Sequence, residues 1–174
     1  MDSNSDAPAV IIDFGAQSCD ISIFDKHTLV TGTVQGGGVN FTDAIQEKLG
    51  VSHEEANLIK TRYGLGPSKR QAELKQAVDP TLEKIVKEIR RMLRYYQERY
   101  DDKHPISQLI TMGGGANMPG LSDHLTQALR MAVRHVDPWQ YLNYKGLEAP
   151  SDADKPMYAT VTGLGMARAK KVFN

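Results

Sequence analysis

The sequence predicts an α/β fold in which helices cover a mixed β-sheet. Three short β-rich segments follow one another near the N-terminus, with tight turns between them, which is typical of an antiparallel meander. Three segments with helical periodicity come next, and the last part of the chain alternates strand, helix, strand and helix. Strands that alternate with helices indicate parallel pairing, so we expect parallel strands beside the meander.

The composition is that of a globular protein with a hydrophobic core. Of the 174 residues, 40% are apolar, and 21 basic side chains balance 21 acidic ones. This balance gives no general attraction to nucleic acid or to an anionic membrane. The single cysteine, Cys19, excludes an intrachain disulfide framework. Because the sequence shows no bilayer-spanning apolar run and no signal peptide, we expect a cytoplasmic protein that does not insert into a membrane.

The N-terminal half predicts the meander and a helix pair. Residues 1–8 are polar and are interpreted as a disordered lead. The predicted strands and the first helix are residues 9–13, 20–25, 28–34 and 41–49. Ser52 and Glu55 form a capping-box pattern that opens a second helix, which ends near Gly64. Residues 66–75 are polar and predict a mobile loop.

A long helix is predicted to begin at Asp79 and Pro80, because a proline in the first turn has no hydrogen bond to lose. Apolar side chains then recur at steps of three and four residues, which predicts a stripe packed against the sheet. The stripe consists of Leu82, Ile85, Ile89, Met92 and Tyr96.

The rest of the chain predicts two strands and two further helices. The segments are a strand at 106–112, a helix at 121–130, a strand at 131–136, a turn at 137–139, a polar loop at 149–156 and a helix at 157–170. The final helix carries small residues that would let it pack closely against a neighbour, namely Ala159, Gly163, Gly165 and Ala167.

The turn between the first two strands is a candidate phosphate site. Gly15 permits close approach of a ligand, and the backbone N–H groups of Gly15, Ala16, Gln17 and Ser18 can donate to phosphate oxygens. The Ser18 hydroxyl can add another bond. Asp13 can hold Mg²⁺ through water, since magnesium gives up its waters reluctantly. The alternative is an ordinary hairpin in which Asp13 caps the turn.

The glycine cluster after the strand at 106–112 is the second candidate ligand contact. Gly113, Gly114 and Gly115 lie between a strand and a helix, where bare backbone can accept a flat ligand and helix N–H groups face outward. Asn117 follows in the same loop. The alternative is a tight strand-to-helix turn.

The third candidate is the triple glycine centred on Gly37, with the helix pair that follows it. Glu54, Glu55 and Lys60 are expected on or near one face of the second helix, from which Glu55 and Lys60 can reach a ribose hydroxyl or an adenine edge. The alternative is a solvated charged face.

The order of these segments resembles the second lobe of the actin superfamily, with a phosphate loop followed by an adenosine loop. The finer similarity is to the PilM family of type IV pilus assembly proteins and covers residues 9–170. It is carried by the segments IIDFGAQSCDISIF, GGGVNFTDAIQEKLGVSHEEANLIKTRYGL, LITMGGGANMPGLSDHL, VDPWQYL and MYATVTGLGMARA. Each loop alone is shared with FtsA, MreB and the heat-shock chaperone ATPases, whereas the Trp139 turn and the final helix favour PilM over FtsA.

The resemblance implies a ribonuclease H-like actin-fold lobe at residues 9–174, with a helical insertion at about 39–80. It implies ATP or ADP and Mg²⁺ as ligands, and attachment to the inner membrane through PilN-like platform proteins. The family's PilN peptide docks mainly on the first half, so we expect its groove to be missing here. Because no first lobe precedes Ala9, we expect no catalytic residues, weak nucleotide binding and negligible hydrolysis unless two copies pair as a homodimer.

Two departures from the family pattern favour a different function class, a protein-interaction scaffold that does not hydrolyse nucleotide. Cys19 stands where threonine is frequent, which removes a hydroxyl near the phosphates. Asn57 stands where glutamate is common, which argues against ribose binding by that helix. A membrane-tethered filament protein like FtsA needs an amphipathic C-terminal tail, and residues 170–174 are too short for one.

Overall fold

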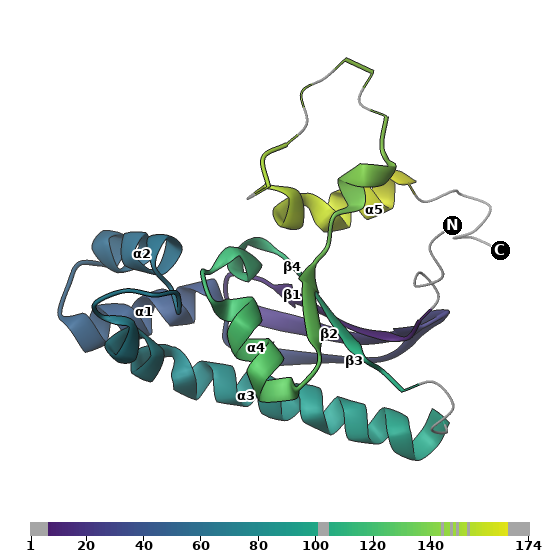
Figure 1. Ribbon diagram of the computed structural model, residues 1–174, viewed down its shortest axis with the longest axis horizontal. Helices are drawn as coiled ribbons and strands as arrows, with labels where there is room; N and C mark the ends of the chain where they lie inside the picture. Colours follow the sequence, from purple (N-terminus) through teal and green to yellow (C-terminus); the bar gives the residue numbers. More distant parts are fainter. Residues whose placement is uncertain are drawn as a thin grey trace.

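The computed structural model describes residues 7–100, 105–143, 145–146, 148, 150–152 and 154–166. Its helices and strands follow the predicted order, β-β-β-α-α-α-β-α-β-α (Figure 1). The strands are β1 (Ala9–Phe14), β2 (Ser18–Asp25), β3 (His27–Gln35), β4 (Gln108–Met112) and β5 (Ala132–His135). The helices are α1 (Gly38–Leu49), α2 (His53–Arg62), α3 (Gln71–Tyr100), α4 (Leu121–Leu129) and α5 (Ala159–Met166). Short 3₁₀ turns lie at Gly114–Asn117, Pro138–Tyr141 and Lys155–Tyr158.

The strands form one mixed sheet in the order β3-β2-β1-β4-β5. The β1–β2 and β2–β3 pairs are antiparallel, as the predicted meander requires, while the β1–β4 and β4–β5 pairs are parallel. In the β1–β4 register Asp13 lies opposite Met112. The carboxyl ends of β1 and β4 therefore lie at the same edge of the sheet, and they bring the Gly15 turn and the Gly113 loop together.

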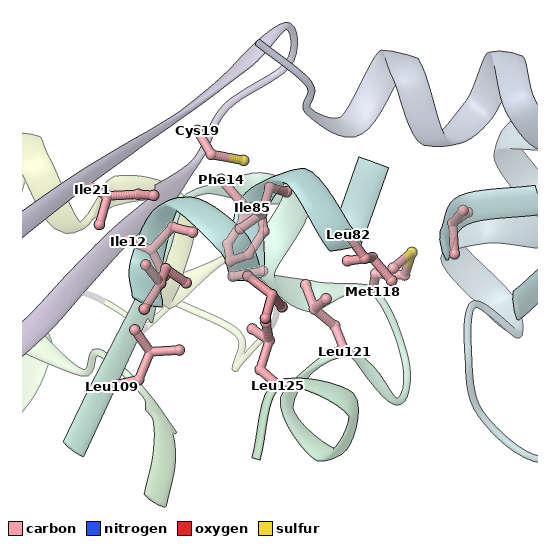
Figure 2. Packing of buried hydrophobic residues seen from close by; sticks show 14 of the residues in the cluster. Ile12, Phe14, Cys19, Ile21, Leu82, Ile85, Leu109, Met118, Leu121 and Leu125 are labelled. Carbon is pink, nitrogen blue, oxygen red and sulfur yellow. The ribbon is translucent and has the colours of Figure 1, made fainter. Parts of the chain in front are cut away.

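The core lies between the sheet and the helices α3 and α4, which pack on one of its faces (Figure 1). Figure 2 shows Ile12 and Phe14 of β1 close to Ile85 of α3 and Leu125 of α4. All five members of the predicted α3 stripe are at most 2% exposed, which confirms the helical periodicity that predicted them. Among the described residues, no helix is both long enough and apolar enough to cross a membrane.

The predicted start of the long helix was wrong. Helix α3 begins at Gln71, so the second half of the predicted loop at 66–75 is helical and Pro80 lies inside the helix. The physical reason is that Leu74 and Val78, each 1% exposed, extend the buried stripe upstream of the proline. Their burial outweighs the hydrogen bond that Pro80 cannot donate. The predicted insertion boundary near residue 80 consequently falls within α3.

Replacing Pro80 with alanine is expected to stabilise the protein. A proline inside a helix costs about 3 kcal/mol relative to alanine. Alanine also makes the unfolded chain more flexible, which reduces the gain in stability by up to about 1 kcal/mol. Because Pro80 is exposed, its side chain contributes little packing. We expect the free energy of unfolding to rise by about 2 kcal/mol, measured by urea unfolding. A fall in stability would mean that Pro80 itself helps to seat α3 on the sheet.

The other predicted helices start within three residues of the observed ones, the largest difference being α1, which begins at Gly38 and not at Phe41. Ser52 caps α2 by accepting a bond from the Glu55 N–H at 3.2 Å, as predicted. The close packing expected at Gly163 and Gly165 of α5 was wrong, because a Cβ atom at either residue would meet no described atom within 4 Å. The predicted lead at residues 1–8 and the end of the predicted helix, 167–170, lie largely or wholly outside the described residues.

Candidate functional site

A cavity of about 780 Å³ lies where the β1–β2 turn, the α1–α2 pair and the loop after β4 meet. All three candidate segments of the sequence thus contribute to one cavity at the end of the sheet. The lining residues are Asp13, Phe14, Gly15, Ala16, Gly38, Val39, Phe41, Thr42, His53, Asn57, Lys60, Thr61, Gly113, Gly114, Gly115, Asn117, Met118, Asp154 and Met157.

The β1–β2 turn is held against the start of α1 by its own carbonyl groups. The Gly15 carbonyl accepts from the Gly38 N–H at 3.0 Å, and the Ala16 carbonyl accepts from the Val39 N–H at 2.8 Å. In a trans peptide the N–H points opposite to the carbonyl, so the N–H groups of Ala16 and Gln17 point away from α1. Neither has a hydrogen-bond partner within the described part of the chain. These two donors are the ones that the turn can offer to an anion.

Gly37 has a structural role in this contact. A Cβ atom at Gly37 would lie 2.5 Å from the Gly15 carbonyl oxygen and 2.8 Å from the backbone of Ala16. No other residue allows the turn and α1 to approach so closely. Asn40 fixes the same segment by accepting the Gly37 N–H at 2.9 Å.

The three glycines after β4 differ in what they contact. Cβ atoms at Gly113 and Gly115 would clash with β1, where Phe14 lies within 3.1 Å of both. Gly113 also donates its N–H to the Pro156 carbonyl at 2.9 Å, which ties the C-terminal segment to the loop. Gly114 is exposed, and the nearest atom to its Cβ position is in Met157 at 3.7 Å. Gly114 therefore presents bare backbone to the cavity.

Lys60 joins α2 to α1 at the wall of the cavity. Its ammonium donates to the Gly38 carbonyl at 2.9 Å and to Thr42 Oγ1 at 2.8 Å. Burial lowers the pKa of Lys60, and the nearby Asp43 acts in the opposite direction. The third ammonium proton remains for a ligand in the cavity.

Asp13 supplies a carboxylate at the carboxyl end of β1. Burial raises its pKa, and Asp20, opposite it on β2, raises the pKa further. A cation beside Asp13 would relieve both effects. The described residues contain no group of three His, Cys, Asp or Glu side chains arranged for a metal. Asp13 therefore fits Mg²⁺ held largely by water and phosphate, and does not fit an all-protein cage.

The Asp13→Asn variant is expected to be at least as stable as the parent protein in the absence of Mg²⁺. An acid whose pKa is raised by folding destabilises the folded state when it ionises, so stability rises as pH falls through that pKa. The neutral amide removes this penalty at neutral pH. The measurement is urea unfolding of both proteins at neutral and mildly acidic pH. A variant that is less stable at neutral pH would show that the Asp13 carboxylate is already compensated.

Eight of the twelve residues predicted for the site line the cavity. They are Asp13, Gly15, Ala16, Lys60, Gly113, Gly114, Gly115 and Asn117. The other four do not: Gln17 at the tip of the turn, Ser18 at the start of β2, Gly37 beneath the turn and Glu55 on α2. Glu55 and Lys60 are five residues apart, so they do not share a helix face.

Sequence reasoning missed the face of α2 that lines the cavity. His53, Asn57, Lys60 and Thr61 follow the helical spacing of four, three and one, and this spacing was available in the sequence. Cys19 does not line the cavity. It is fully buried, donates its thiol to the Gly36 carbonyl at 3.1 Å, and burial raises its pKa to about 12. The cysteine therefore removes no donor from the site.

Comparison with known proteins gives one family and one fold. The family model described as type IV pilus assembly protein PilM matches residues 1–169. Among solved structures, a PilM-PilN type IV pilus biogenesis complex matches with a TM-score of 0.74 and 24% identity, covering 92% of this chain and 46% of that one.

More distant solved structures share the fold. The ethanolamine utilization protein EutJ from Carboxydothermus hydrogenoformans matches with a TM-score of 0.62 and 19% identity, over 91% of this chain and 49% of EutJ. MreB 5 of Spiroplasma citri bound to AMPPNP matches with a TM-score of 0.63 and 13% identity, over 92% of this chain and 52% of MreB 5. The chain thus spans about half the length of the structures it matches, and its fold is that of an actin-like lobe.

Proposed function

The chain belongs to the type IV pilus assembly protein PilM family, and from that premise we propose that its cavity binds ATP or ADP with Mg²⁺. Structures of MreB 5 with the same fold are described as bound to AMPPNP and to ADP, which supports this ligand class. The observation that carries the proposal is the free backbone N–H of Ala16, which lines the cavity together with the carboxylate of Asp13, with a second free N–H at the adjacent Gln17.

In this proposal the β1–β2 turn holds the phosphates. The N–H groups of Ala16 and Gln17 donate to phosphate oxygens, and Asp13 holds Mg²⁺ through water. The magnesium ion offsets phosphate charge when bound. The bonds from Gly38 and Val39 to the carbonyls of the turn fix these donors before the ligand arrives, so little ordering cost remains.

The sugar and base lie farther along the cavity, between α2 and the Gly114 loop. Lys60 and Asn57 offer polar groups from the α2 side, while Met118 and Met157 provide apolar surface on the other side. The bare backbone at Gly114 lets a planar base lie close to the loop.

We further propose that this lobe acts in type IV pilus assembly on the cytoplasmic side of the inner membrane, together with a PilN-like platform protein. The support is the family match and the likeness to a PilM-PilN complex. The second candidate, a scaffold without nucleotide, is favoured by one observation. Asn57, where the family commonly has glutamate, lies in the cavity wall, so the wall lacks a negative charge at that point.

Calorimetry with ATP and ADP in the presence of Mg²⁺ tests the proposal. We expect binding that requires Mg²⁺ and weakens at least about tenfold in Asp13→Asn, since one charge-assisted contact is worth about 1.5–3 kcal/mol. The Asp123→Asn variant is the matched control, because Asp123 is exposed on α4, does not line the cavity and does not act on the pKa of Asp13. No binding at millimolar nucleotide by the folded protein would contradict the proposal and favour the scaffold.

A further inference from the structure

A second hollow, of about 840 Å³, lies along α3 and is bordered by α4, outside the nucleotide cavity. We call it the α3–α4 groove. Nine of its twelve lining residues carry a charged side chain. The lining residues are Lys75, Asp79, Glu83, Lys84, Val86, Lys87, Glu88, Arg90, Arg91, Arg94, His124 and Ala128.

Positive charge dominates the groove although the chain as a whole has none in excess. Six Lys or Arg side chains line it against three Asp or Glu, and two of those acids already have partners. Asp79 pairs with Lys75 at 3.4 Å, and Glu88 pairs with Arg91 at 2.6 Å. Burial lowers the pKa of His124, so this side chain adds no charge near neutral pH.

Three cations of the groove have neither an ion-pair nor a hydrogen-bond partner within the described residues, namely Lys84, Lys87 and Arg94. All three are exposed and belong to the outward face of α3, opposite the buried stripe. Helical rise places Lys84 and Arg94 about 15 Å apart, with Lys87 between them. Arg90 is fixed nearby by donating to the Ala128 carbonyl at 2.7 Å. The result is a row of unpaired positive charge along a hollow.

We propose that the α3–α4 groove docks an acidic segment of a partner protein. A segment with a carboxylate at each helical turn, or an extended acidic stretch of about five residues, matches the length of the row. The carboxylates of the segment pair with Lys84, Lys87 and Arg94. Glu83 and Glu88 repel any segment whose carboxylates would lie opposite them. Charge complementarity of this kind selects a partner and its register.

The groove fits a protein segment better than a membrane or a nucleic acid. A membrane-binding helix exposes apolar side chains beside its basic ones, whereas the apolar stripe of α3 is buried in the core. A continuous phosphate backbone would meet the carboxylates of Asp79, Glu83 and Glu88 along the same groove. A narrow segment with spaced acids avoids these carboxylates.

The test is fluorescence anisotropy with a labelled oligoglutamate peptide, long enough to span the row, and an oligoglutamine peptide of equal length. We expect the folded protein to bind oligoglutamate in a salt-dependent way and to ignore oligoglutamine. The double variant Lys87→Glu/Arg94→Glu should bind at least about tenfold more weakly, because each reversal replaces an attraction with a repulsion. Both residues are exposed, so circular dichroism should show an unchanged fold.

The matched control is Lys48→Glu/Arg62→Glu, which changes the net charge equally on exposed positions of α1 and α2. It should leave oligoglutamate binding within about twofold of the parent protein. Equal weakening by both double variants would reduce the effect to net charge and overturn the proposal. Binding to phosphatidylglycerol vesicles without binding to oligoglutamate would also overturn it, in favour of a membrane surface.

Discussion

The Gly37→Ala variant is expected to lose about 2–3 kcal/mol of its free energy of unfolding, the usual cost of overpacking where nothing can yield. The added Cβ atom would lie 2.5 Å from the Gly15 carbonyl oxygen. The clash is between backbone and side chain, so no rotamer change relieves it. The turn and α1 must separate, which breaks the Gly38–Gly15 and Val39–Ala16 bonds and displaces the phosphate donors. Urea unfolding measures the loss, and calorimetry should show nucleotide binding abolished.

The neighbouring Gly38→Ala variant is the matched control. Its Cβ atom would lie 3.7 Å from Lys60 Nζ and 3.8 Å from the Gly15 carbonyl oxygen, which are ordinary contacts. Since Gly38 is the first residue of α1, alanine should stabilise the helix by up to about 1 kcal/mol. Equal stability of the two variants would show that the turn does not depend on close approach of Gly37.

The Gly114→Val variant is expected to bind nucleotide at least about tenfold more weakly while keeping its fold, because the branched side chain fills space that the ligand needs. Gly114 lies in the cavity wall, its φ angle is not positive, and its Cβ position has only Met157 nearby. The variant therefore separates binding from stability. Calorimetry with ADP and Mg²⁺ gives the affinity, and thermal unfolding without ligand checks the fold.

The same substitution at Gly163 is the control, because a Cβ atom there meets no described atom within 4 Å and the residue does not line the cavity. Gly163→Val should bind nucleotide like the parent protein. If Gly114→Val also retained full affinity, the ligand would not lie against the loop after β4.

The sequence predicted the strands and the order of elements because these depend on local patterns. Alternation in β2 and the three- and four-residue steps of α3 are visible in any window of the chain. The start of α3 was mispredicted because the rule for Pro80 is local, while the burial of Leu74 and Val78 depends on the assembled core. Local preference gave way to tertiary packing there.

The sequence predicted the parts of the site that are formed by the backbone of glycine loops, but it was a poorer guide to the parts that are formed by side chains. Gly15 and Gly113 could be recognised from the sequence, because a Cβ atom at either position would clash with neighbouring backbone and only glycine fits there. The sequence predicted Glu55 on the face of α2 that lines the cavity, whereas Asn57 lies there. These two residues are two positions apart and therefore point to different sides of the helix. Asp154 and Met157 line the cavity because the hydrogen bond from the Gly113 N–H to the Pro156 carbonyl holds their segment beside the loop after β4. The two partners are far apart in the chain, so no local sequence pattern predicts this contact.

The most direct test of the nucleotide site is a two-dimensional NMR titration of the ¹⁵N-labelled chain with ADP and Mg²⁺. We expect the largest amide shifts at Ala16, Gln17 and Gly114, with smaller shifts near Lys60 and none along the α3–α4 groove. Shifts confined to the α3–α4 groove, or no shifts at saturating nucleotide, would contradict the assignment of the cavity to ATP or ADP.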